Sequence, residues 1–421
     1  MIKINFKIFL KDNKEILKNF SFLSILQFFQ LIIGFLLFPY LIKVLGMENY
    51  GVIIFAQAIT AYFLIVLNYG LNITATKQVA KHKEDQIKLS EIISSVYVTK
   101  IIILIILIFI FFSMLFCFSF FNDFFWIYIL TFFSLVGWLL YPEWYFQGIE
   151  KMENITYVMM SSKVLSVVFI FLLVKSPNDF YYVPVINSAS MIISGIIGVS
   201  LMRKSILNRN FIFSTSFESV KNQFNLGFSI FLANIVANTK DYLNTFIIGA
   251  LLSYQTVAVY DLANKIVKVL MVPSSILYRV VFPRISVNKS IKTVFRVEKI
   301  TMIYSLFMVF ILFVTPDIMI RYIIDKDLEV FKKTLLILSF SIPLLSLCGS
   351  RGVLRLVGFN KDKYFMNGII ISVTSYLFVI LALYYSDKIS ITTMAIGLIF
   401  SIVIELLSHF YYGFKEKKLY E

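Results

Sequence analysis

The sequence is poor in charged residues, cysteine and histidine, and each shortage excludes a class of protein. Only 15% of its 421 residues are charged and 59% are apolar, whereas soluble globular domains average about 25% charged residues. The two cysteines, Cys117 and Cys348, lie in apolar stretches, so we interpret them as buried small residues rather than as a disulfide or metal pair. The two histidines, His82 and His409, are isolated in the sequence and have no metal-ligand spacing. We therefore expect no metal and no cofactor.

Motifs and long loops for catalysis are missing as well. The sequence contains no G-x-x-x-x-G-K-[ST] stretch, so it does not predict nucleotide hydrolysis by a P-loop. It has no large polar domain that could house transferase or polymerase chemistry. No small-residue cleavage site follows the first apolar run, which indicates a retained anchor rather than a signal peptide. These absences predict a protein that is not an enzyme.

Long apolar runs dominate what is present. A helix needs roughly 20 apolar residues to span a bilayer, and twelve runs of that kind occur. They fall near residues 20–45, 50–70, 92–118, 122–146, 155–175, 181–202, 224–252, 258–283, 299–323, 331–357, 364–386 and 389–413. We predict an all-α, multi-pass membrane protein with twelve transmembrane helices.

The distribution of basic residues predicts the orientation of these helices. The net charge is +15, but the basic residues lie mainly in short segments between apolar runs, which argues against nucleic acid as a partner. If the N-terminus lies in the cytoplasm, 26 of the 39 Lys and Arg residues fall in cytoplasmic segments and seven in outer loops. Cytoplasmic loops of membrane proteins carry such an excess. Both termini are therefore predicted to be cytoplasmic.

The two halves of the chain resemble each other. Leu45, Val52, Ala56 and Ile59 match Leu252, Val259, Ala263 and Ile266 at a shift of 207 residues. This indicates an internal duplication with parallel halves, a known plan among transporters. The predicted organisation is a six-helix bundle over 1–202 (including a cytoplasmic segment, 1–19), a cytoplasmic linker over 203–223, and a second six-helix bundle over 224–421.

Polar residues inside the predicted spans are the candidate functional residues, because ionisable groups within the membrane are costly. The run 258–283 carries a row of them on one helical face, and the run 224–252 carries a second row. Two lysines on one face demand an anionic partner, and Asp261 neutralises only one of Lys265 and Lys268. The candidate substrate-binding residues are Lys265, Lys268, Lys240, Arg279, Gln27, Gln57, Asn68, Asn234, Asn238 and Asn264, and the candidate ion-coupling residues are Asp241 and Asp261.

Some of these positions have a simpler interpretation. The Gln, Asn and Ser side chains are expected to form hydrogen bonds between helices in many bundles, and Arg279 lies close enough to a span end to reach water. Asp317 and Glu405 are carboxylates near span ends, where we expect them to face water rather than to titrate with transport.

Four segments carry a family resemblance. Residues 45–51 read L-G-M-E-N-Y-G, which resembles the L-G-x-x-x-Y-G signature of polysaccharide-exporting flippases. Residues 141–152 read Y-P-E-W-Y-F-Q-G-I-E-K-M and resemble the P-x-W-x-F-Q-G-x-E-x-M stretch of O-antigen flippases. Asn68-Tyr69-Gly70 and Phe282-Pro283-Arg284 fit the same family.

The resemblance implies a fold and a function. The fold is that of the multidrug/oligosaccharidyl-lipid/polysaccharide exporter superfamily: two six-helix bundles around a V-shaped central cavity, working by alternating access without a cofactor. The implied substrate is an oligosaccharide repeat unit of O-antigen or capsule, linked through pyrophosphate to undecaprenol. It would be moved from the cytoplasmic to the outer leaflet of the bacterial inner membrane, with coupling to an ion gradient. Membrane lipids, a glycan polymerase and a chain-length regulator are the expected partners.

Two alternatives stay open. A cation-coupled multidrug exporter shares the fold, but its cavity should be acidic or aromatic, whereas the predicted cavity is basic. A membrane-embedded glycan polymerase would need catalytic residues on a sizeable outer loop, and the longest predicted outer segment, near 321–333, is short.

Overall fold

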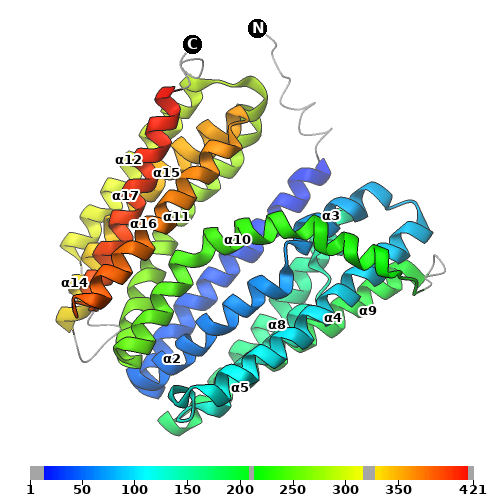
Figure 1. The fold of residues 1–421 in the computed structure, drawn as a ribbon, viewed down its shortest axis with the longest axis horizontal. Coiled ribbons are helices and arrows are strands. Elements are labelled where there is room, and N and C mark those ends of the chain that lie inside the picture. Colours follow the sequence, from blue (N-terminus) through cyan, green and yellow to red (C-terminus); the bar gives the residue numbers. More distant parts are fainter. Residues whose placement is uncertain (1–13, 208–212, 316–327, 416–421) are drawn as a thin grey trace. The chain divides into compact units, whose positions relative to one another are not determined.

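The structure is a computed structural model that describes residues 14–207, 213–315 and 328–415. Within these three ranges every regular element is a helix, and none is a strand (Figure 1). The all-α class is therefore confirmed. The segment near 321–327 and the last lysines, Lys417 and Lys418, lie outside the described residues, as does Asp317.

Backbone contacts divide the chain into two compact units. Unit 1 comprises residues 1–45 and 56–235, and unit 2 comprises residues 46–55 and 236–421. Each unit is described by itself below. The bundle boundaries at 202 and 224, the internal duplication and the V-shaped cavity stay predictions.

Unit 1 is built from long apolar helices joined by short turns. Helix α9 packs along α6 and α8, and the short α7 packs on α3 (Figure 1). The helices that lie wholly or largely in this unit are α2 (Lys14–Asn68), α3 (Leu71–His82), α4 (Gln86–Cys117), α5 (Phe125–Phe132), α6 (Ser134–Leu140), α7 (Glu143–Gly148), α8 (Met152–Leu173) and α9 (Tyr182–Leu207), with short 3-10 turns at Ser119–Phe121 and Pro177–Tyr181.

Unit 2 contains the second part of α10 and the helices that follow it. Helix α16 packs along α17, while α11 packs on α14 and α12 on α15. The elements are α10 (Phe217–Leu251), α11 (Tyr254–Asn288), α12 (Ile291–Val314), α14 (Leu328–Ser339), α15 (Ser341–Cys348), a π-helical stretch η3 (Gly349–Leu356), a 3-10 turn η4 (Val357–Phe359), α16 (Asp362–Tyr385) and α17 (Ile391–Lys415).

Nine helical segments of the described chain are long and apolar enough to cross a membrane. A multi-pass membrane protein is therefore confirmed, while the count of twelve stays a prediction. Helix α2 has 55 residues, more than twice the length of one span, and Gly46 interrupts it with a left-handed backbone (φ 80°). Helices α10 and α11 are long, but their polar residues keep them out of the nine.

One expectation drawn from a single residue is wrong. Cys117 is exposed rather than buried, whereas Cys348 is buried as expected. Arg351 and Arg355 lie in the π-helical stretch η3. Arg355 is only 1% exposed, and Arg351 forms an ion pair with Glu298. Turns of π-helix are frequent at functional sites. The apolar pattern of the sequence did not predict this one.

The Y-P-E-W-Y-F-Q-G segment packs α7 against α3 in unit 1. Trp144 and Phe146 are fully buried, and the carbonyl of Trp144 accepts a hydrogen bond from the Thr76 hydroxyl at 3.1 Å. A Cβ at Gly148 would lie 2.6 Å from the Cβ of Val79. The segment therefore fixes the buried face of α3, and thereby decides which face of α3 is left exposed.

Candidate functional site

The second part of α10 and all of α11 carry most of the predicted site residues, and in unit 2 these residues form ion pairs. Lys265 of α11 donates to Asp261 Oδ2 at 2.6 Å, one helical turn away, and to the Tyr50 hydroxyl at 2.8 Å. The Tyr50 hydroxyl in turn donates to Asp261 Oδ2 at 3.0 Å. Three polar groups thus satisfy one another in a partly buried triangle.

Tyr50 belongs to the L-G-M-E-N-Y-G segment, and the structure explains the pattern of that segment. Gly46 has the positive φ that glycine adopts at no steric cost. A Cβ at Gly51 would lie 1.7 Å from the carbonyl oxygen of Tyr254, so only glycine allows this contact with the start of α11. Tyr50 itself is 2% exposed and holds Lys265 and Asp261. Sequence reasoning recognised the motif but missed this role of the tyrosine.

The second lysine of the row, Lys268, forms a looser pair. Its Nζ donates to Asp241 Oδ2 of α10 at 3.0 Å. The side chains are 53% and 47% exposed, which makes this the most accessible of the ion pairs formed by the three lysines Lys240, Lys265 and Lys268. Asp241 is therefore the carboxylate that neutralises Lys268, because Asp261 pairs with Lys265.

Lys240 of α10 forms the most buried pair. Its Nζ donates to Glu405 Oε2 of α17 at 2.7 Å and to the Ser372 hydroxyl of α16 at 2.8 Å. Glu405 is 9% exposed, so the expectation that it faces water is wrong. Glu405 lies within α17 rather than at its end, and the basic group that holds it comes from another helix, which sequence position alone does not show.

Each of the three lysines in this part of the chain is therefore matched by a carboxylate. Lys240, Lys265 and Lys268 balance Glu405, Asp261 and Asp241. The three lysines predicted to bind substrate therefore belong to charge-balanced ion pairs, which range from buried to half-exposed.

The remaining predicted residues lie on both units. In unit 2, Asn264 is partly exposed and Arg279 is exposed, while Asn238 is partly buried. In unit 1, Gln27 and Gln57 are exposed and Asn68 and Asn234 are partly buried. Of these, Gln57 lines a small cavity of about 140 Å³ together with Thr60, Thr131, Ser134 and Trp138.

A buried polar chain in unit 2 was not predicted. Asn244 of α10 donates to the Tyr260 hydroxyl at 2.7 Å and accepts from the Tyr376 hydroxyl at 2.6 Å. All three residues are fully buried. Asn244 lies in the predicted span 224–252, and the hydrogen-bonding needs of a buried amide are the signal that points to such partners.

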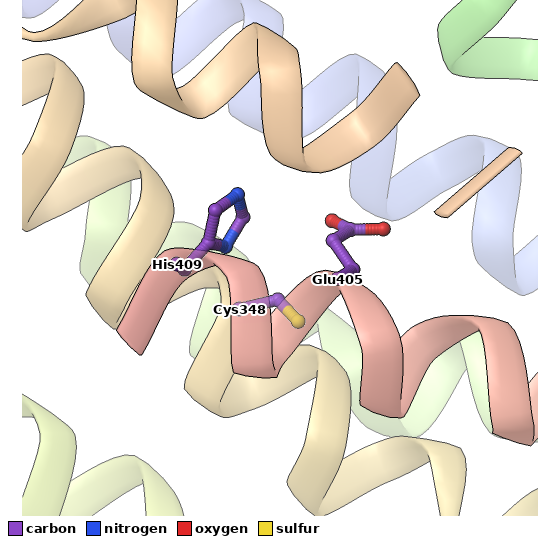
Figure 2. A group of neighbouring side chains, drawn as sticks. All are labelled: Cys348, Glu405 and His409. Carbon is purple, nitrogen blue, oxygen red and sulfur yellow. The ribbon is translucent and has the colours of Figure 1, made fainter. Parts of the chain in front are cut away.

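Cys348, Glu405 and His409 form a second unpredicted cluster (Figure 2). Glu405 and His409 project from one face of α17, where their spacing of four residues places them one turn apart, and Cys348 reaches them from α15. Their nearest sulfur, oxygen and nitrogen atoms lie within 4.8 Å of one another. Lys240 already neutralises the carboxylate of this cluster, so we assign no metal to it.

These features define a multi-pass helical membrane protein with charged side chains inside its helical units, the class that comprises transporters. The chain belongs to the polysaccharide biosynthesis protein family, whose sequence profile matches residues 16–289. It is 26% identical over 359 residues to a protein of Escherichia coli (strain K12) named "Putative O-antigen transporter". The aligned region covers 83% of this chain and 85% of that protein. A protein of Shigella dysenteriae with the same name is 25% identical over 274 residues, or 64% of this chain and 67% of the relative.

Solved structures agree on the fold. The lipid II flippase MurJ in an inward closed conformation superposes with a TM-score of 0.72 at 16% identity, covering 92% of this chain and 86% of MurJ. An inward-facing multidrug transporter of the MATE family, in the MOP superfamily, superposes with a TM-score of 0.70 at 15% identity, covering 94% and 95% of the two chains. These likenesses support an all-helical fold of this kind, while the twelve helices, the internal repeat, the V-shaped cavity and the orientation of the termini stay predictions.

Proposed function

We propose that this protein is a flippase that moves an oligosaccharide, joined through pyrophosphate to undecaprenol, from the cytoplasmic to the outer leaflet of the bacterial inner membrane. It works by alternating access, without a cofactor and without catalysis. The family match and the relatives named as O-antigen transporters support the substrate class. The likeness to MurJ supports the fold alone.

One observation carries the proposal: the Lys268–Asp241 pair is half-exposed, with one member on each of the long helices α10 and α11. A charged pair in a membrane protein faces protein, water or a charged ligand rather than lipid, because charges in hydrocarbon are costly. An exposed ion pair contributes little to stability, about 0–1 kcal/mol. A ligand phosphate can therefore displace Asp241 from Lys268 at small cost.

This displacement also provides the proposed coupling. When a diphosphate oxygen takes the Lys268 ammonium, the Asp241 carboxylate loses its partner. An unpaired carboxylate in that setting favours a proton or a sodium ion. Substrate binding and ion binding then reinforce each other at Asp241. The Lys265–Asp261–Tyr50 triangle, which is less exposed, holds α11 in position behind the exchanging pair.

Translocation tests the proposal directly. The wild-type chain, produced in a flippase-deletion strain, should restore surface glycan, and the Lys268→Ala/Lys265→Ala variant should not, although it inserts into the membrane at the normal level. Full glycan assembly by the variant would contradict both the substrate role of Lys268 and the positioning role of Lys265. For the coupling, transport into vesicles should fall when the ion gradient is collapsed, and unchanged transport would contradict it.

Multidrug export requires its own assay because the charge balance of the α10–α11 row weakens the argument against it. The three ion pairs carry no net charge among themselves, so they do not repel a cationic drug. Proteoliposomes should therefore be offered a lipid-linked oligosaccharide and, separately, tetraphenylphosphonium. Transport of the drug without transport of the oligosaccharide would overturn the flippase assignment in favour of an exporter.

A further inference from the structure

Unit 1 contains a cavity of about 930 Å³, lined by residues of α3, the start of α4 and the start of α10. It is separate from the α10–α11 ion pairs, which belong to unit 2. Its lining is rich in amine and amide groups: Lys77, Gln78, Lys81, His82, Lys88, Lys221, Asn222, Gln223 and Asn225 are all among the lining residues.

The floor of this cavity is rigid. Gln223 of α10 is 2% exposed. It exchanges two amide hydrogen bonds with Gln78 of α3, at 3.0 and 3.1 Å, and donates to the Ser95 hydroxyl of α4 at 3.1 Å. Across the same junction, the Ser219 hydroxyl donates to Glu91 of α4. These bonds join the three helices, so the side chains above them project from a fixed frame.

The charges above the floor are not balanced. Lys88 pairs with Glu91 at 3.1 Å and cancels it. Lys77, Lys81 and Lys221 form no ion pair with any described residue, and among the lining residues only Glu218 opposes them. Three positive charges against one negative charge leave a net charge of +2. Like charges gathered around one cavity repel one another, so a bound anion would stabilise the arrangement.

The geometry of the helices directs these lysines to the same place. Lys77 and Lys81 are four residues apart on α3 and share a face, and the opposite face of α3 is buried against α7 by the Y-P-E-W-Y-F-Q-G segment. Helix α10 begins at Phe217, and Lys221 lies in its second turn. The start of a helix favours negative charge because its backbone N–H groups are unpaired there.

Exposed apolar side chains lie at the cavity and next to its lining residues. Leu226 lines it and is 44% exposed. Ile87 and Phe217, adjacent to the lining residues Lys88 and Glu218, are more than four-fifths exposed. A cavity with cationic lining residues and exposed apolar side chains beside them fits an amphiphile with an anionic head and a hydrocarbon tail better than it fits a free phosphate ion.

We propose that this cavity is a binding site for the diphosphate head of a prenyl-linked lipid, with Lys77, Lys81 and Lys221 as its ligands. This assignment rests on the proposed flippase function, and it adds a capture site in unit 1 that precedes transfer to Lys268. The signature segment around Trp144 then has a functional purpose, since it orients α3 so that Lys77 and Lys81 face the cavity.

Binding of farnesyl diphosphate to the purified full-length protein tests the site. The Lys77→Gln/Lys81→Gln/Lys221→Gln variant should bind at least tenfold more weakly than the wild type, a loss of about 1.4 kcal/mol or more. The matched control is Lys292→Gln/Lys299→Gln/Lys363→Gln, which removes the same charge from three exposed lysines of unit 2 and should bind within twofold of the wild type. Equal affinity of wild type and the cavity variant would overturn the proposal, as would equal weakening in the control.

Competition distinguishes the sources of the phosphate. Undecaprenyl diphosphate should displace farnesyl diphosphate, whereas inorganic pyrophosphate and phosphatidylglycerol nanodiscs should do so at least tenfold less well. Equal competition by phosphatidylglycerol would make this a phospholipid site and overturn the assignment.

The two proposals fail separately. If the wild type restores surface glycan while the cavity variant both binds and transports normally, only the capture site is wrong. If the wild type does not restore surface glycan, the flippase function is wrong, whatever the cavity binds.

Discussion

Two groups of lysines in this protein carry the same charge in opposite settings. Lys240, Lys265 and Lys268 of unit 2 each donate to a carboxylate, whereas Lys77, Lys81 and Lys221 of unit 1 line a cavity without an ion-pair partner among the described residues. A paired lysine stabilises the fold or exchanges its partner, while an unpaired one is available to a ligand from the start. Lysine within an apolar chain therefore marks function only once its partner is known.

Within unit 2, the exposure of an ion pair predicts how much its disruption should lower the stability of the protein. The Lys240 and Glu405 side chains are 12% and 11% exposed, while those of Lys268 and Asp241 are 53% and 47% exposed. Removal of one member of a buried pair leaves an uncompensated charge, whereas an exposed member is solvated by water. The three pairs should thus differ in their effect on stability in the order of their burial.

The largest expected effect comes from the buried pair. Glu405→Leu leaves the Lys240 ammonium with the Ser372 hydroxyl alone, and breaking a buried pair typically costs about 3–5 kcal/mol. The thermal transition of the purified protein should fall markedly. The double variant Lys240→Met/Glu405→Leu should recover most of the loss, because two apolar side chains replace the pair. No recovery in the double variant would show that the lysine and the glutamate act independently.

A smaller effect is expected at the glycine of the L-G-M-E-N-Y-G segment. Gly51→Ala places a methyl group 1.7 Å from the Tyr254 carbonyl oxygen, and such overpacking costs roughly 1–3 kcal/mol. The matched control is Gly34→Ala on the same helix, where the added Cβ meets nothing within 4 Å. The control should keep or slightly raise the unfolding temperature, since alanine is the better helix former. Equal losses in both variants would contradict the packing role of Gly51.

The sequence predicted the class of fold well and the site only in part. Apolar runs indicate helices directly, and the motif resemblance identified Tyr50 and Trp144 as members of signature segments. The partners of the lysines could not be derived, because Asp241 and Lys268 are 27 residues apart and Glu405 is 165 residues from Lys240. Helical spacing relates residues on one helix, whereas these pairs depend on which helices pack together.

The cavity lysines illustrate the same limit. Lys77 and Lys81 lie between the predicted spans 50–70 and 92–118, and Lys221 lies in the predicted linker 203–223. Nothing in their spacing indicated a shared cavity. The exchange between Gln78 and Gln223, which are 145 residues apart, brings their helices together.

The smallest effect on stability is expected at Lys268. A double-mutant cycle of Lys268→Met and Asp241→Asn, measured by thermal unfolding, should give a coupling energy of no more than about 1 kcal/mol, because both side chains are well exposed. The corresponding cycle of Lys265→Met and Asp261→Asn should give a larger value, since Tyr50 completes that triangle. The reverse order would contradict the grading of the pairs by burial.

The most direct test of the flippase account is translocation of an undecaprenyl-pyrophosphate-linked oligosaccharide in proteoliposomes that contain the purified full-length protein. The wild type should move the lipid between leaflets faster than protein-free vesicles do, and Lys268→Met should abolish most of that rate while its unfolding temperature stays close to the wild-type value. Translocation by Lys268→Met at the wild-type rate, or no translocation by the wild type, would contradict the account.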